Sequence, residues 1–215
     1  MRKLLVSLSL LPLATVALAQ ETPSSTAFDI EKLAIEAGYS TQGYFITPEY
    51  SITDSFRVRV PLYFGGQDMS MDTGDTEIDY SLSHNAIGVM ADYYILGGPI
   101  RLSGGLISGG YNLTADIKDL DLDGYAYSGD FSLEIEPSLA IAPVVALGTA
   151  IDIEQFGVHI DIGARLSGLS ISSTGQNGLP VALRNDYNDS IDDINDDLES
   201  IPLLPYLSIG LRYSF

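Results

Sequence analysis

Cysteine and tryptophan are both missing from the 215 residues of the chain, and basic residues are scarce. Without cysteine no disulfide staples the fold. Lys and Arg number 10 against 29 Asp and Glu, which gives a formal net charge of −19. Nucleic-acid binding requires a basic face, and adhesion to an anionic membrane surface requires positive charge. The composition therefore predicts no nucleic-acid partner.

A long hydrophobic run is also missing beyond the first twenty residues. A membrane-spanning helix needs about 20 consecutive apolar residues, so none is expected. The mean hydropathy is nevertheless positive, at +0.18, which means that apolar and acidic residues are segregated along the chain. There is no phosphate-binding loop, no Cys/His metal cluster and no cofactor fingerprint. We expect no cofactor and no enzyme.

The N-terminus has the pattern of a secretory signal peptide. Arg2 and Lys3 are followed by an apolar stretch from Leu4 to Leu13, and Ala17-Leu18-Ala19 supplies a small-x-small cleavage pattern. The apolar stretch is too short for a retained anchor, and no cysteine follows it, so a lipoprotein is excluded. The expected organisation is a signal peptide at 1–19, a periplasmic segment at 20–30 and an outer-membrane β-barrel at 31–215.

Apolar and polar residues alternate with a period of two, most clearly at the C-terminus. From residue 203 to 215 one parity is apolar or aromatic, and the other is polar or small. The segments 156–168 and 56–64 show the same split. Successive side chains of a strand point to opposite faces, so each segment predicts a strand with one oily face. The apolar parity at the C-terminus comprises Leu207, Ile209, Leu211, Tyr213 and Phe215.

The alternation predicts eight strands with connections of two sizes. Tight turns are expected at 53–55, 96–99 and 152–155, and longer acidic loops at 71–77, 115–137 and 169–203, with a tight first one near 40–43. Short turns at one edge and long loops at the other indicate an all-β, eight-stranded antiparallel transmembrane barrel. The strands are expected at 31–39, 44–52, 56–70, 78–94, 100–114, 138–150, 156–168 and 204–215.

Charged residues inside these strands fall on the polar parity, and this separates a barrel from a soluble antiparallel sandwich. An arginine facing lipid at mid-membrane costs about 2–4 kcal/mol, whereas arginines facing inward can pair with carboxylates on neighbouring strands. Buried charges need such pairing. The expected interior network comprises Glu36, Glu49, Arg57, Arg59, Asp92, Arg101, His159, Asp161, Arg165 and Arg212.

The C-terminal pattern resembles the signature of outer-membrane barrel proteins, in which the terminal Phe and the alternating apolar residues before it are read by the barrel-assembly machinery. The whole chain after the signal peptide is similar to small eight-stranded proteins of the OmpA-transmembrane, OmpW and opacity type, and most of all to a poorly characterised proteobacterial group. This resemblance implies the fold and export to the outer membrane, but no activity. It is carried by residues 56–59, 88–94, 100–106 and 205–215.

One acidic segment has the spacing of a calcium loop. Asp119, Asp121, Asp123 and Gly124, followed by Asp130, match the start and end of an EF-hand loop, although Glu is usual at the last position. The flanking residues are strand-like and not helical. A hairpin with an Asp-Gly turn explains the same residues.

An amphipathic helix is expected within the last loop, at 185–200. Tyr187, Ile191, Ile194 and Leu198 recur at helical spacing, and Asn185 is placed to cap the first turn. Its apolar stripe should cover the barrel mouth or the other loops, and it could also bind a partner.

The leading hypothesis is a structural or surface-exposed outer-membrane protein without enzymatic activity. A narrow channel for small solutes or ions is the first alternative, and a loop-mediated adhesin or receptor is the second. His84 beside Ser81 and Ser83 is the one arrangement that could suggest hydrolytic chemistry. The expected partners are outer-membrane lipid, lipopolysaccharide and the barrel-assembly machinery, with divalent cations possible at the acidic loops.

Overall fold

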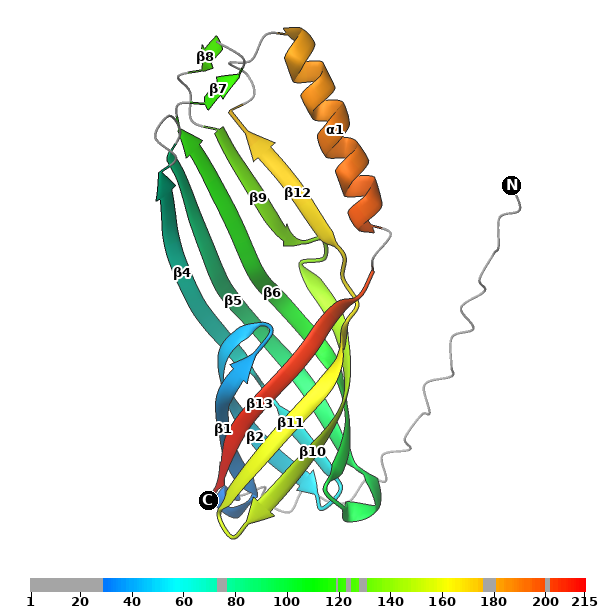
Figure 1. The fold of residues 1–215 in the computed structure, drawn as a ribbon. Helices are drawn as coiled ribbons and strands as arrows, with labels where there is room; N and C mark the ends of the chain where they lie inside the picture. The colour runs from blue at the N-terminus through cyan, green and yellow to red at the C-terminus, as the bar shows by residue number, and fades with distance from the viewer. Residues whose placement is uncertain are drawn as a thin grey trace, which may run out of the picture.

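The strands of the protein close into an antiparallel barrel, from which a sheet extends at one end (Figure 1). The computed structural model describes residues 29–72, 77–118, 120–122, 125–127, 131–175, 181–199 and 202–215. The expected signal peptide lies outside these residues. The elements are η1 (Ile30–Lys32), β1 (Leu33–Ser40), β2 (Gly43–Thr53), β3 (Phe56–Arg59), β4 (Leu62–Asp72), β5 (Glu77–Tyr94), η2 (Ile95–Gly97), β6 (Ile100–Lys118), β7 (Leu120–Leu122), β8 (Tyr125–Tyr127), β9 (Phe131–Pro137), β10 (Ile141–Ile153), β11 (Phe156–Arg165), β12 (Leu169–Thr174), α1 (Val181–Glu199) and β13 (Leu204–Ser214).

The barrel closes because β1 pairs with β2 on one side and with β13 on the other. β3 and β4 together make the third strand of the ring. Between them Pro61 has no N–H to donate, but its carbonyl still accepts from Gly88, and the Val60 N–H donates to Pro48. Pairing continues from β5 through β6, β10 and β11 to β13. The predicted eight-stranded antiparallel barrel is confirmed.

The short connections gather at one end of the barrel, as the sequence predicts. The β10–β11 turn uses Glu154 at φ 57°, and the β5–β6 turn uses Leu96 at φ 55°, both in the left-handed region that tight turns require. The two ends of the ring meet here, since the Phe215 N–H donates to the Leu33 carbonyl over 3.1 Å. This end, where Figure 1 marks the C-terminus, is called the turn end below.

At the other end the strands run well beyond the barrel, which the predicted loops did not anticipate. β4, β5, β6, β9 and β12 form a five-stranded sheet that rises above the β1–β2 hairpin (Figure 1). The expected loops at 115–137 and 169–203 are therefore wrong in part, because they contain β9 and β12. The strand expected at 138–150 also begins later, at Ile141. This sheet is called the extension.

The apolar face of the strands changes side between the barrel and the extension. In the barrel the outward side chains are large, apolar and exposed, as for Ile87 and Val89 of β5. In the extension the apolar pairs lie on the face that continues the barrel interior: Leu82 with Leu113, Tyr80 with Ala115 and Ile78 with Ile117. The opposite face carries the pairs Ser83–Asn112, Ser81–Thr114 and Asp79–Asp116. The extension therefore has the polarity of a water-exposed sheet with one apolar face.

Helix α1 packs against the edge strand β12 and covers part of that apolar face. The Tyr187 ring lies 5.2 Å from the ring of Phe131 on β9. The helix starts earlier than expected, at Val181, so Asn185 is a residue of its first turns and not its cap. Ile194 is exposed, and Asn195 takes the expected place of Ile194 against the sheet.

No helix within the described ranges is both long and apolar enough to cross a membrane.

Candidate functional site in the barrel interior

The lower half of the barrel is filled by charged side chains that point inward from seven strands. Successive side chains of a strand point to opposite faces, so every second side chain points into the lumen. All are buried except Arg57, whose side chain is 15% exposed. The expected residues lie on β1 (Glu36), β2 (Glu49), β3 (Arg57, Arg59), β5 (Asp92), β6 (Arg101), β11 (His159, Asp161, Arg165) and β13 (Arg212).

The centre of the cluster is a pair of arginines among three carboxylates. Arg101 holds Asp161 with two donors, Nε to Oδ1 at 2.9 Å and Nη2 to Oδ2 at 2.8 Å. Arg59 donates from Nε to Asp92 Oδ1 at 3.3 Å and from Nη2 to Asp161 Oδ2 at 3.2 Å. Glu36 bridges both guanidinium groups, at 3.5 Å from Arg59 and 3.3 Å from Arg101. The bidentate pair of Arg101 with Asp161 is charge-assisted, and such pairs are among the strong hydrogen bonds of side chains.

A second group lies nearer the turn end and centres on Glu49. Its Oε1 accepts from Arg212 at 2.8 Å and from Arg57 at 3.1 Å. Asp152 adds a second carboxylate, 3.3 Å from Arg212. The Arg57 guanidinium also lies over the Tyr94 ring, 4.2 Å from its centroid, which is cation–π geometry. The two groups share Tyr94, whose hydroxyl accepts from Arg57 and Arg101.

Each charge in this cluster depends on its neighbours. Removing one partner of a buried ion pair costs about 3–5 kcal/mol, because the remaining charge stays buried without compensation. Asp161 accepts from Arg59, Arg101 and the Ser208 hydroxyl, which makes it the most shared carboxylate of the group. The arrangement holds opposite sides of the ring together, since β13, β1 and β2 lie between Asp161 on β11 and its partner Arg59 on β3.

His159 sits at the upper boundary of the charges. Its Nδ1 is 3.5 Å from Glu36, and neither ring nitrogen has a hydrogen-bond partner among the described residues. The ring packs 5.8 Å from that of Phe45. His159 therefore joins the charged cluster to the apolar residues above it.

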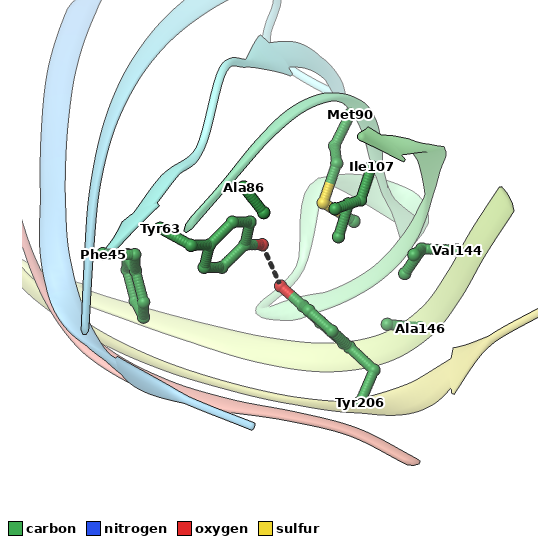
Figure 2. Packing of buried hydrophobic residues seen from close by; sticks show 8 residues of the cluster. All are labelled: Phe45, Tyr63, Ala86, Met90, Ile107, Val144, Ala146 and Tyr206. Atoms are coloured by element: carbon green, nitrogen blue, oxygen red, sulfur yellow. Dashed lines mark hydrogen bonds between the residues drawn. The ribbon is translucent and has the colours of Figure 1, made fainter. Parts of the chain in front are cut away.

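An apolar layer crosses the barrel above the charges (Figure 2). Tyr63 of β4 and Tyr206 of β13 reach toward each other, and their hydroxyl oxygens are 3.1 Å apart. Phe45 packs edge-on against the Tyr63 ring. The hydrogen bond satisfies two hydroxyls that would otherwise be buried without partners. The layer comprises Phe45, Tyr63, Ala86, Met90, Ile107, Val144, Ala146 and Tyr206.

Arg165 lies apart from the cluster, near the extension. Inward arginines are expected from the sequence to pair with carboxylates, and among the described residues this is wrong for Arg165. It donates to Gln42 Oε1 at 2.9 Å and to the carbonyls of Gly109 and Leu139 at 2.6 and 3.4 Å. These carbonyls lie where the pairing partner of β6 changes from β10 to β9. Arg165 therefore donates to main-chain carbonyls at the point where the ladder between the strands is interrupted.

Sequence reasoning did not single out four residues of this interior: Gln42, Asp152, Tyr63 and Tyr206. Asp152 shares the parity of the inward-facing Ala146 and Ala150 on β10, so the alternation could have found it. Tyr206 lies on the inward parity of the last strand. The contacts that these four residues make across the lumen cannot be predicted from the pattern of any single strand.

The suggested serine–histidine pair is not formed. His84 faces inward on β5, where its ring lies 6.4 Å from that of Tyr111 on β6. Ser81 and Ser83 are at odd offsets from His84 and so point to the other face of the same strand. Neither serine can donate its proton to that imidazole without leaving the strand.

The suggested calcium loop is largely outside the described residues, which include Asp121 but not Asp119, Asp123 or Asp130. The backbone around it forms a small antiparallel pair of β7 with β8, as in the hairpin alternative. Within the described ranges no group of three His, Cys, Asp or Glu side chains is placed to hold a metal ion. Calcium binding stays a prediction.

The C-terminal residues expected to act as the assembly signal face outward from β13. Leu207, Ile209, Leu211 and Phe215 are exposed on the barrel exterior. Tyr213 packs edge-on against Phe156 and Phe215 at the turn end. Recognition by the assembly machinery stays a prediction.

The chain is similar to solved bacterial structures, two of which are from Acinetobacter baumannii. The crystal structure of Acinetobacter baumannii CarO2 matches with a TM-score of 0.56 at 18% identity, over 85% of this chain and 98% of that chain. That of Acinetobacter baumannii CarO matches with a TM-score of 0.56 at 16% identity, over 86% and 97%. No family model and no curated protein sequence matches the chain. The relation to the OmpA, OmpW and opacity-type families stays a prediction, and what the comparison establishes is the barrel fold.

Proposed function

We propose that the protein is an integral outer-membrane β-barrel of a Gram-negative bacterium, with a structural or surface-exposed role and no catalytic activity. The observation that carries the proposal is an exposed apolar exterior around an ion-paired interior. Exposed apolar area costs about 25 cal/mol per Å² in water, whereas lipid removes that cost. The exterior includes Val145, Leu147, Ile151, Val158, Ile160, Ile162, Leu207, Ile209 and Leu211, each more than 40% exposed.

The orientation follows from the two ends of the barrel. Barrels of this kind keep short turns in the periplasm and long connections outside the cell. The turn end and both ends of the strand ring then face the periplasm, and the extension with α1 faces the surface. Export directed by residues 1–19 and insertion directed by the C-terminal strand complete the route. Lipopolysaccharide would surround the base of the extension.

A channel is the weaker candidate because the lumen is filled. A water column would leave its lining side chains with exposed area, since a water-sized probe would reach them. Glu36, Asp92, Arg101, His159 and Asp161 are each 0% exposed. The apolar layer closes the same lumen above them. Planar bilayers containing the folded protein should therefore show no conductance. Stepwise, ion-selective increases in conductance would instead favour the channel function.

A charge placed on the exterior tests the membrane location directly. Ile160, 44% exposed on β11, would face lipid, whereas Ile194, 43% exposed on α1, would face water. Ile160→Arg should cost about 2–4 kcal/mol and reduce the heat-modifiable form in the outer-membrane fraction. Ile194→Arg is the matched control and should leave both unchanged. Equal tolerance of the two variants, or a wild-type protein in the soluble periplasmic fraction, contradicts the proposal.

A further inference from the structure

The extension ends in an uncovered strand edge. β4 pairs with β2 only as far as Phe64, opposite Tyr44, while its pairing with β5 continues to Asp72. From Gly66 to Met71 no described strand lies on the other side, and all six residues are exposed. The Pro61 carbonyl bonds to β5, so the antiparallel alternation turns the N–H and C=O groups of Gly66, Asp68 and Ser70 to the open side.

The opposite edge of the same sheet is covered. There the Asn195 side chain of α1 accepts from the Ile171 N–H at 2.8 Å and donates to the Ile171 carbonyl at 2.9 Å. These two bonds occupy the groups that a neighbouring strand would use. Open edges are templates for the addition of another chain, and proteins normally block them. The chain blocks the β12 edge with its own helix and leaves the β4 edge open.

The two faces beside the open edge differ in chemistry. On the face that continues the barrel interior, Met69 and Met71 are 56% and 48% exposed and lie next to the apolar pairs of β5 and β6. On the other face Asp68 is exposed on the edge strand, opposite Ser81, whose hydroxyl donates to Asp68 Oδ1 over 2.8 Å. Asp79, opposite Ser70, and Asp116 lie further into the sheet on the same face. A cationic side chain on an added strand could pair with the exposed Asp68 carboxylate directly across from it, and opposite charges in such cross-strand positions are stabilising.

We propose that the β4 edge from Gly66 to Met71 binds an extended segment of a partner protein in which apolar and basic residues alternate. The added strand would bond to the backbone of Gly66, Asp68 and Ser70, as in β-strand addition. Its apolar side chains would cover Met69 and Met71, and its basic side chains would lie beside Asp68. The inference rests on the proposed function in one respect, that this edge is outside the membrane and accessible.

Two other occupants fit less well. A second copy of the chain would bring two acidic faces together across the new strand pair, at a formal net charge of −19 for each copy. Lipopolysaccharide phosphates are anionic and would meet the same carboxylates. A metal ion is also a poor match, because within the described ranges no three acidic or His side chains are positioned around one point. A cationic, extended polypeptide satisfies the backbone and both faces at once.

The test uses the full-length mature barrel, folded in detergent micelles, and a fluorescent peptide of alternating Lys and Val. We expect saturable binding by anisotropy, and slower hydrogen exchange of the amides of residues 66–70 when the peptide is bound. Ser70→Pro removes one edge N–H that β5 does not use, and should weaken binding about tenfold or more. Ser70→Ala is the matched control and should bind as the wild type does.

Several results would overturn the inference. These are equal binding by the proline and alanine variants, no exchange protection at residues 66–70, and equal binding of a peptide of alternating Glu and Val. Dimerisation of the protein without peptide, lost in Ser70→Pro, would assign the edge to a second copy instead. The heat-modifiable band of each variant shows that the barrel is folded. Binding in micelles does not depend on cellular location, so failure here is separate from failure of the outer-membrane proposal.

Discussion

The Asn195 side chain occupies both backbone groups of Ile171, one as acceptor and one as donor. A residue of a helix thereby takes the place of a neighbouring strand at the β12 edge. This contact anchors α1 to the extension together with the packing of Tyr187 on Phe131. The helix is thus part of the sheet's edge protection and not a loose loop insertion.

Asn195→Ala should loosen α1 without disturbing the barrel. Two hydrogen bonds at about 0.5–1.5 kcal/mol each would be lost. We expect faster hydrogen exchange at Ile171 and along the helix, and an unchanged heat-modifiable band. Asn188, exposed on the same helix, supplies the control Asn188→Ala, which should not change the exchange of β12. Unchanged exchange in Asn195→Ala would show that the amide contact contributes nothing to docking.

Asp161→Asn should destabilise the barrel strongly. The change removes the charge that Arg59 and Arg101 share in the buried cluster, and we expect a loss of about 3–5 kcal/mol. Urea unfolding in lipid vesicles measures this. Asp152→Asn is the control, because Asp152 is 36% exposed and pairs at the rim, where a loss below about 1 kcal/mol is expected. Equal losses would mean that the central cluster is not the main support of the interior.

The Tyr63–Tyr206 hydrogen bond predicts a non-additive double-mutant cycle. Each single change, Tyr63→Phe or Tyr206→Phe, leaves the other hydroxyl buried without a partner, at about 1–3 kcal/mol. The double variant removes both hydroxyls and should be no less stable than either single variant. The same vesicle unfolding assay gives the coupling. Additive losses would show that each hydroxyl has another partner, such as water.

Two adjacent glycines should respond differently to one methyl group. A Cβ at Gly105 would lie 2.2 Å from the Val89 carbonyl oxygen and 2.8 Å from the Met90 Cα. Both are backbone atoms of β5, so Gly105→Ala should separate the strands and cost about 1–3 kcal/mol or more. Gly104 has no atom within 4 Å of such a Cβ, so Gly104→Ala should be neutral or slightly stabilising. Refolding yield into vesicles distinguishes them, and similar yields would contradict the strand spacing.

The eight strands of the barrel and their inward and outward faces follow from the sequence alone. Because the strand period is two, the parity of Arg59, Arg101 and Asp161 was enough to direct them inward, and the tight turns were marked by their residues. The helix was also visible in its spacing, although its start was misplaced. The extension was less visible, since β9 and β12 carry acidic and serine residues that are typical of loops as well as of exposed strand faces.

The partners of those inward residues were decided by the tertiary structure. Ring closure and strand stagger bring Arg101 to Asp161, 60 residues away, and Arg212 to Glu49, 163 residues away. The same geometry gives Arg165 main-chain carbonyls in place of a carboxylate. Alternation within one strand determines which side a residue faces, but the level at which it meets the opposite wall depends on the register of all eight strands together.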